Sequence, residues 1–170
     1  TELFSPDTAA VKEWDVLVAC RLVDRLKNLG VLGPLGRSFR VAVAGSGPDE
    51  ARLRKRFPHV AWLGRIPHEE LPRLFRASRV FMHTGRREIL PRVITEALSC
   101  GVPVVAFAGP ITPEAVPPGC GLLLPKRGYI GPIGDLLANE AARRTMGAAA
   151  RAHAVARLSP AAVEGPVEEM

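Results

Sequence analysis

The sequence predicts an α/β fold, built as a doubly wound, mainly parallel six-stranded sheet with helices on both faces. Two observations predict it. Short apolar runs alternate with amphipathic segments along the chain, which is typical of βαβ units. The runs are apolar throughout, as in strands that are buried on both faces of a sheet. The length of 170 residues suits one compact domain, and we expect a single domain over residues 1–170.

Six apolar runs are strand candidates, and five segments between or after them have helical periodicity. The strands are predicted at 16–20, 40–45, 60–64, 80–84, 102–107 and 121–125. The helices are predicted at 25–35, 48–57, 68–77, 91–100 and 140–157. Such an order is Rossmann-like, and ligands of these sheets bind beyond the carboxyl ends of the strands, where the strand order reverses. The residues that follow each strand are therefore the candidates for a functional site.

The net charge of +6 comes mostly from arginine and is spread along the chain. It is read either as a solvated, arginine-rich surface or as a field that attracts phosphates, anionic lipids or nucleic acid. Nucleic-acid binding is not expected, because the one Tyr, two Trp and six Phe do not alternate with the basic residues. Phosphate is the anion that the charge favours.

Cysteine and histidine usage argues against a metal site. Cys20, Cys100 and Cys120 form no CxxC pair, and an odd count does not indicate a disulfide framework. The chain contains no Asp-x-Asp motif or histidine cluster. No apolar run approaches the ~18 residues of a membrane span, and the first ten residues do not resemble a secretory signal. We expect a protein of the reducing cytoplasm.

The segments that follow the first three strands are suited to a phosphorylated ligand. Arg21, Arg25 and Lys27 follow the first strand, and together they could neutralise a diphosphate, although basic residues are also ordinary on a solvated helix. Gly45, in "GSGPDE", allows close backbone approach, but the third glycine of GxGxxG is missing and packing alone explains many such turns. In "WLGRIP" the main chain could lie against a flat base, or the segment could be an ordinary turn from strand to loop.

The stretch "EILPRVITE" places two glutamates around a helix start. A residue before proline avoids the helical region, so the helix should begin near Pro91 and leave Glu88 in the preceding loop. Glu96 then lies roughly 7 Å inside the helix, and Glu88 lies up to about 10 Å outside it. We expect the carboxylates to hold opposite ends of one long ligand, with phosphates at the helix N-terminus between them. A nucleotide sugar has that arrangement of groups.

These residues also resemble a known family. "EILPRVITE" resembles the E-x7-E motif of retaining glycosyltransferases with the GT-B fold. "ITEALSCGVPVVA", "VAVAGSGPDEARLR", "VAWLGRIPHEELPRLFRAS" and "GCGLLLP" are similar to segments of the nucleotide-binding domain of glycosyltransferase family 4 (group 1), in the same order. The resemblance covers roughly residues 16–155. It implies half of a GT-B fold, the donor-binding C-terminal domain, without the N-terminal acceptor domain.

The resemblance implies a role for each matching position. Glu88 would hold the donor sugar, Glu96 would accept hydrogen bonds from the ribose, and Arg21 and Lys27 would bind the phosphates and stabilise the leaving nucleotide. The main chain at Arg65 and Ile66 would face the base, and that at Ile89 and Leu90 would approach the sugar and phosphates. The sequence departs from the family pattern at two positions: Cys20 replaces a glycine that is common before the basic residue, and "TGRRE" replaces the serine-containing segment that usually precedes the first glutamate. Both departures affect the expected fine geometry of donor binding.

The expected activity is transfer of a sugar from a UDP or GDP sugar to an acceptor held by another domain, without a cofactor and without activity in the isolated domain. A membrane-surface acceptor, compatible with the basic charge, would bring the protein to the inner membrane surface. The alternative is a nucleotide-binding regulatory module without transferase activity. A nicotinamide-dependent oxidoreductase is disfavoured, because GxGxxG does not follow the first strand.

Overall fold

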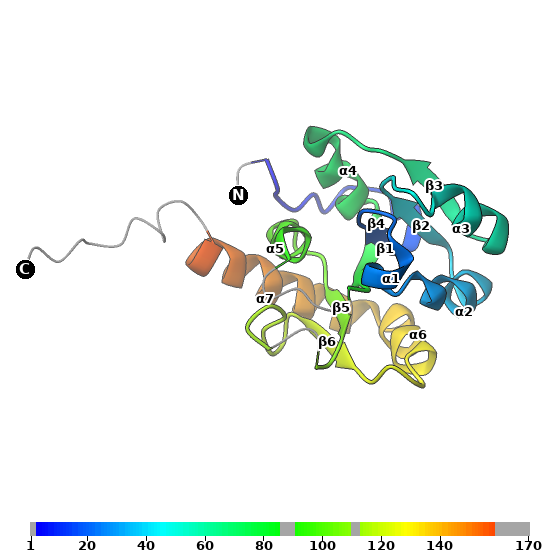
Figure 1. The fold of residues 1–170 in the computed structure, drawn as a ribbon. Helices are drawn as coiled ribbons and strands as arrows, with labels where there is room; N and C mark the ends of the chain where they lie inside the picture. The colour runs from blue at the N-terminus through cyan, green and yellow to red at the C-terminus, as the bar shows by residue number, and fades with distance from the viewer. Residues whose placement is uncertain (1–2, 86–90, 110–112, 159–170) are drawn as a thin grey trace, which may run out of the picture.

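The computed structural model describes residues 3–85, 91–109 and 113–158 (Figure 1). The strands are β1 (Trp14–Ala19), β2 (Val41–Ala44), β3 (Ala61–Gly64), β4 (Ser78–His83), β5 (Val104–Phe107) and β6 (Gly121–Leu124). The α-helices are α1 (Asp24–Lys27), α2 (Leu32–Ser38), α3 (Glu50–Arg56), α4 (Leu71–Arg76), α5 (Arg92–Ser99), α6 (Ile130–Ala138) and α7 (Glu140–Leu158). Two short 3-10 helices, η1 (Leu29–Val31) and η2 (His68–Glu70), precede α2 and α4.

The six strands form one sheet in the order β3-β2-β1-β4-β5-β6, and every neighbouring pair is parallel. Val16 in β1 is in register with Val41 of β2 on one side and with Val80 of β4 on the other. The chain moves outward from β1 to β3 and then returns to place β4 on the other side of β1. The strand order therefore reverses between β1 and β4, which confirms the predicted doubly wound fold.

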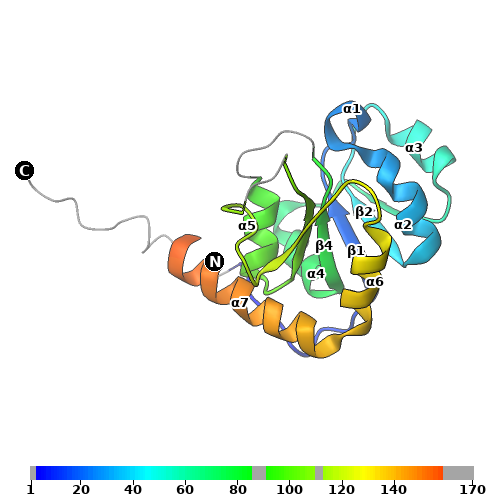
Figure 2. The same cartoon turned by 90° about the horizontal axis from the view of Figure 1, so that it is seen from below.

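Each face of the sheet has its own hydrophobic core, because alternate residues of a strand point to opposite faces. On one face, Leu17 and Phe81 pack with buried residues of α4, α5 and α7. On the other face, Val16 and Val80 pack with residues of α2, α3 and α6. Figure 2 shows the helices on both sides of the sheet. Strands β2 and β5 are buried at every residue, as their continuous apolar sequences predicted, and β1 and β4 are buried over most of their length.

The helices differ from the prediction in several places, and the predicted helix 68–77 is divided into η2 and α4. The predicted helix 25–35 is divided into α1, η1 and α2, because Asn28 adopts a left-handed conformation with φ 51°, which interrupts regular helix. Helix α3 begins at Glu50 rather than at Pro48. Helix α6 was not predicted, since Gly131, Pro132 and Gly134 weaken its helical signal, yet Ile133 is fully buried on the sheet.

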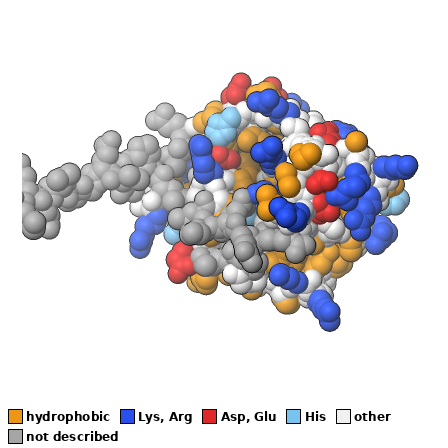
Figure 3. All heavy atoms as spheres, viewed as in Figure 1, with side chains coloured by type: hydrophobic (Ala, Val, Ile, Leu, Met, Phe, Trp, Pro, Cys, Tyr) orange, Lys and Arg blue, Asp and Glu red, His pale blue; other side chains and the backbone are white. Residues whose placement is uncertain are grey.

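The surface charge is mixed over the face shown in Figure 3, where lysine and arginine side chains are spread out with acidic side chains between them. Several arginines have acidic partners, such as Arg54 with Glu50 at 2.9 Å. Within the described ranges, no helix is both long and apolar enough to span a membrane.

Candidate functional site

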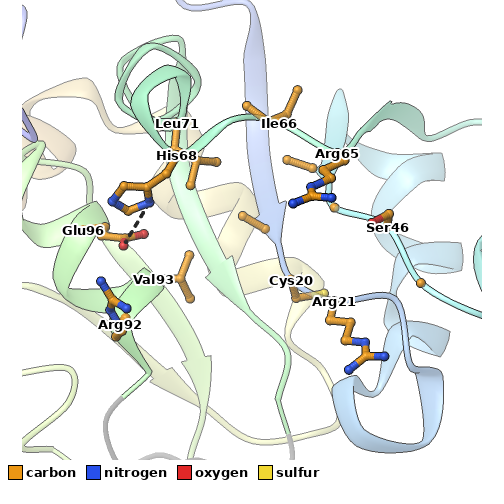
Figure 4. A pocket seen from close by; sticks show the side chains of 14 residues that line it. Cys20, Arg21, Ser46, Arg65, Ile66, His68, Leu71, Arg92, Val93 and Glu96 are labelled. Atoms are coloured by element: carbon orange, nitrogen blue, oxygen red, sulfur yellow. Dashed lines mark ion pairs between the residues drawn. The ribbon is translucent and has the colours of Figure 1, made fainter.

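A cleft of about 680 Å³ opens at the carboxyl end of the sheet, beside the reversal of strand order (Figure 4). One wall comes from the ends of β1 and β2 and the segment after β3, and the other from η2, α4 and α5. The lining residues are Ala19, Cys20, Arg21, Ala44, Gly45, Ser46, Gly47, Arg65, Ile66, His68, Leu71, Arg92, Val93 and Glu96. The cleft thus has the position that doubly wound sheets use for ligands.

Close contact between the segments after β1 and β2 shapes the first wall. Gly45 has φ 138°, and a Cβ atom there would lie 1.9 Å from the carbonyl oxygen of Cys20. The backbone N–H of Leu22 donates to the carbonyl of Ser46 at 2.9 Å, which ties the two segments together. Packing alone therefore requires Gly45, and a bare backbone faces the cleft as a consequence.

A small polar network holds these two segments farther from the cleft. The Asp49 carboxylate accepts a hydrogen bond of 2.9 Å from the backbone N–H of Asp24, at the start of α1. Arg52 donates to both carboxylates, at 3.0 Å to Asp49 and 3.2 Å to Asp24. The Asp24 N–H and then the Arg52 guanidinium lower the pKa of Asp49. The network keeps the end of β1, with Arg21, beside the end of β2.

The cleft has a positive balance of charge. Arg21, Arg65 and Arg92 line it and are exposed to solvent. Figure 4 shows Arg21 and Arg65 on one side and Arg92 with Glu96 on the other. Three guanidinium groups and a single carboxylate line a space that suits an anionic ligand such as a diphosphate.

Glu96 lies in α5, with 14% of its side chain exposed. Burial raises the pKa of its carboxyl, and the charges of His68 and Arg92 partly oppose that rise. The Nδ1 atom of His68 lies 3.8 Å from the Glu96 Oε1 atom (Figure 4). A partly buried carboxylate at the cleft wall is costly to keep charged, and this cost is typical of a group that serves a ligand.

The structure brings five of the predicted site residues to one cleft: Arg21, Gly45, Arg65, Ile66 and Glu96. Lys27, at the end of α1, is half-buried and is not among the lining residues.

Glu88, Ile89 and Leu90 lie outside the described residues. His68, to which the sequence analysis assigned no role, also lines the cleft. The sequence feature that could have indicated His68 is its position two residues after Ile66, in the segment that was predicted to face a base.

The model of the family "Glycosyl transferases group 1" matches residues 11–153. The chain belongs to this family. The match extends over all six strands, so it includes every segment that lines the cleft.

Curated relatives include two proteins named GDP-mannose-dependent alpha-mannosyltransferase. The one from Mycobacterium tuberculosis is 37% identical over 108 residues, which are 61% of this chain and 26% of the relative. The one from Mycolicibacterium smegmatis is 30% identical over 140 residues, or 81% of this chain and 36% of the relative. The chain thus spans about a quarter to a third of these proteins.

Solved structures share the fold at low sequence identity. The C-terminal domain of the group 1 family glycosyl transferase LpcC from Francisella tularensis superimposes with a TM-score of 0.79 at 15% identity, over 94% of this chain and 97% of that one. Anabaena HepE in complex with UDP superimposes with a TM-score of 0.77 at 22% identity, over 92% of this chain and 50% of that one. The fold is therefore that of a GT-B C-terminal domain.

Potential metal ligands are scattered in this fold. Over residues 3–85, 91–109 and 113–158, no three His, Cys, Asp or Glu side chains gather as a metal site would require.

Proposed function

We propose that the chain is the donor-binding domain of a retaining glycosyltransferase that transfers a sugar from a nucleoside diphosphate sugar to an acceptor held by a separate N-terminal domain. The observation that carries the proposal is the cleft, where three arginines and one partly buried glutamate meet at the reversal of strand order. GDP-mannose is the first donor to test, because both mannosyltransferase relatives are named for it.

The diphosphate is proposed to lie between the two walls, near Arg21 and the N-terminus of α5. No side chain caps α5 among the described residues, and Arg92 and Val93 of its first turn line the cleft. Uncapped N–H groups and the positive end of the helix dipole favour an anion. Together with the guanidinium groups they would stabilise the negative charge that develops on the departing nucleoside diphosphate.

The nucleoside is proposed to lie along η2 and the segment after β3. The main chain at Arg65 and Ile66 would face the base, and the charged Glu96 carboxylate would accept hydrogen bonds from the ribose hydroxyls. These contacts would offset the cost of keeping this carboxylate charged in a partly buried position. Glu88 would position the sugar, and Lys27 would contribute charge to the phosphate region.

The chemistry proposed for this domain is positioning and charge stabilisation. The bond from the anomeric carbon to the diphosphate oxygen would break, with its electron pair leaving on the diphosphate beside the arginines. The acceptor hydroxyl oxygen would bond to the anomeric carbon on the same face and give its proton to the departing diphosphate. Because the acceptor site would belong to another domain, the isolated chain is expected to bind donor without transferring sugar. A membrane-surface acceptor remains part of the proposal for the full-length enzyme.

Titration calorimetry of the chain with GDP, UDP and ADP, and with GDP-mannose, tests the proposal. Glu96→Ala is expected to weaken binding by about 1–3 kcal/mol, as for loss of one partner of buried hydroxyls, or roughly 5- to 150-fold in Kd. The matched control is Glu69→Ala, which removes an exposed carboxylate of η2 that does not line the cleft. Absence of nucleotide binding to the unmodified chain would overturn the donor assignment.

A further inference from the structure

An N-terminal segment of the chain, residues 3–6, is hydrogen-bonded to helices α4 and α7. The Arg76 guanidinium of α4 donates from Nε to the carbonyl of Ser5 at 2.7 Å and from Nη2 to the carbonyl of Leu3 at 3.1 Å. Arg151 of α7 donates from Nη1 to the carbonyls of Phe4 and of Ser99, both at 2.9 Å. Because Ser99 ends α5, this contact fixes the segment relative to the helix that carries Glu96.

Phe4 connects this segment to the cleft. Its side chain is buried, with 8% exposed, and its ring makes an edge contact with Phe75 at 6.2 Å between centroids. On another side the Phe4 ring lies 5.1 Å from the imidazole of His68, with an interplanar angle of 55°. The His68 ring is therefore supported from behind by a residue that the core and two arginines hold in place.

His68 in turn faces Glu96 across the cleft wall, at 3.8 Å from Nδ1 to Oε1. Among the described residues, the His68 imidazole faces the Glu96 carboxylate in an ion-pair geometry, and the positive charge of Arg92 in the first turn of α5 also acts on this carboxylate. A carboxylate that must accept hydrogen bonds from a ligand works best when it is already oriented. The contacts from Phe4 to His68 and from His68 to Glu96 could supply that orientation.

We propose that His68, supported by Phe4, is a positioning residue that holds the Glu96 carboxylate ready for the ribose hydroxyls of the donor. This inference rests on the proposed function and adds a residue that the E-x7-E motif does not contain. His68 side-chain exposure is 53%, so its pairing with Glu96 contributes little to folding. Its effect is expected in discrimination for the ribose rather than in stability.

The test compares the affinity of the chain for GDP and for 2′,3′-dideoxy-GDP, which lacks the ribose hydroxyls. The Kd for the dideoxy analogue divided by the Kd for GDP measures the ribose contact alone, because a change in folding or in phosphate binding affects both values equally. Glu96→Ala should bring the ratio close to one. His68→Ala should lower the ratio by about two- to fivefold, which is the size expected for losing one partly exposed polar neighbour.

Three further variants sharpen the comparison. His68→Gln, which keeps a hydrogen-bond donor at this position, should restore part of the ratio. Phe4→Leu keeps an apolar side chain in the core but removes the ring that supports the imidazole, so it should lower the ratio in the same direction as His68→Ala. His59→Ala is the matched control, because His59 is exposed and lies before β3, at the opposite end of that strand from the cleft.

The outcomes separate the two proposals. A His68→Ala chain that retains the ratio of the unmodified chain would refute the role of His68 while leaving nucleotide binding intact. An unmodified chain that binds GDP and its dideoxy analogue equally would refute the ribose contact itself, and with it this inference. A chain that binds no nucleotide would overturn both proposals.

Discussion

Replacement of Gly45 by alanine tests how the cleft is built. The added Cβ would lie 1.9 Å from the Cys20 carbonyl oxygen, where contacts under 3.0 Å are essentially never seen, and φ at this position is 138°. The Cys20 carbonyl cannot move freely, because hydrogen bonds from Cys20 N–H to the Ala44 carbonyl, at 3.0 Å, and from Leu22 N–H to the Ser46 carbonyl hold the segment.

The magnitude follows from two costs. A backbone conformation that side chains rarely adopt costs about 1–3 kcal/mol, and a forced overlap in a packed site costs about 1–3 kcal/mol more. The sum of about 2–6 kcal/mol is a large share of the roughly 5–15 kcal/mol that stabilises a typical domain. Gly45→Ala is therefore expected to be severely destabilised and to lose the first wall of the cleft.

Urea unfolding followed by circular dichroism measures this effect. Gly30→Ala is the matched control, since a Cβ at Gly30 meets nothing within 4 Å and φ there is not positive. This control should be neutral, or more stable by about 0.4–1 kcal/mol. A Gly45→Ala chain that loses less than about 1 kcal/mol would refute the argument that backbone contact requires this glycine.

Three shorter predictions concern polar groups in and near the cleft. Thr84→Val should leave the free energy of unfolding in urea unchanged or raise it by up to about 1 kcal/mol, because the buried Oγ1 atom has no hydrogen-bond partner among the described residues. A decrease of more than about 1 kcal/mol in this free energy would contradict the prediction. Iodoacetamide should modify Cys20, which lines the cleft, before Cys100, because burial raises the pKa of the Cys100 thiol to about 12. Peptide mass spectrometry should also show that bound nucleotide protects Cys20 from modification. Equal labelling of the two thiols would contradict their assigned exposures. Burial raises the pKa of Glu96 in the folded state, so between the ordinary and the raised pKa the folded chain holds a proton that the unfolded chain has released, and this group makes stability fall as pH rises through that interval. The urea midpoint of Glu96→Gln, which lacks the titrating group, should therefore exceed that of the unmodified chain by an amount that grows as pH rises through the interval. A difference that stays constant with pH would contradict the raised pKa.

The sequence was sufficient to predict the sheet because its inner strands are largely buried and therefore read as apolar runs. Continuous apolar runs marked all six strands to within a few residues, and their alternation with helices predicted the parallel order. The helices were less predictable where local signals conflict with tertiary packing. Helix α6 forms despite its glycines and proline because Ile133 and Leu136 are buried against the second core.

The candidate site was predicted in part. The positions of Arg21, Gly45 and Glu96 after their strands were enough to predict that these residues lie at one cleft. The sequence could not show that packing against Cys20 determines the Gly45 conformation, since that contact joins segments that are distant along the chain. It also could not show that the ring of Phe4, from a distant part of the chain, contacts the imidazole of His68.

The most direct test of the central claim is to locate the nucleotide on the chain by nuclear magnetic resonance. We predict that GDP shifts the backbone amide signals of Cys20, Gly45, Ile66 and Glu96, which surround the cleft, and that Glu96→Ala reduces these shifts at equal ligand concentration. Shifts confined to another surface, such as the small cavity of about 50 Å³ beside Phe57, would contradict the account.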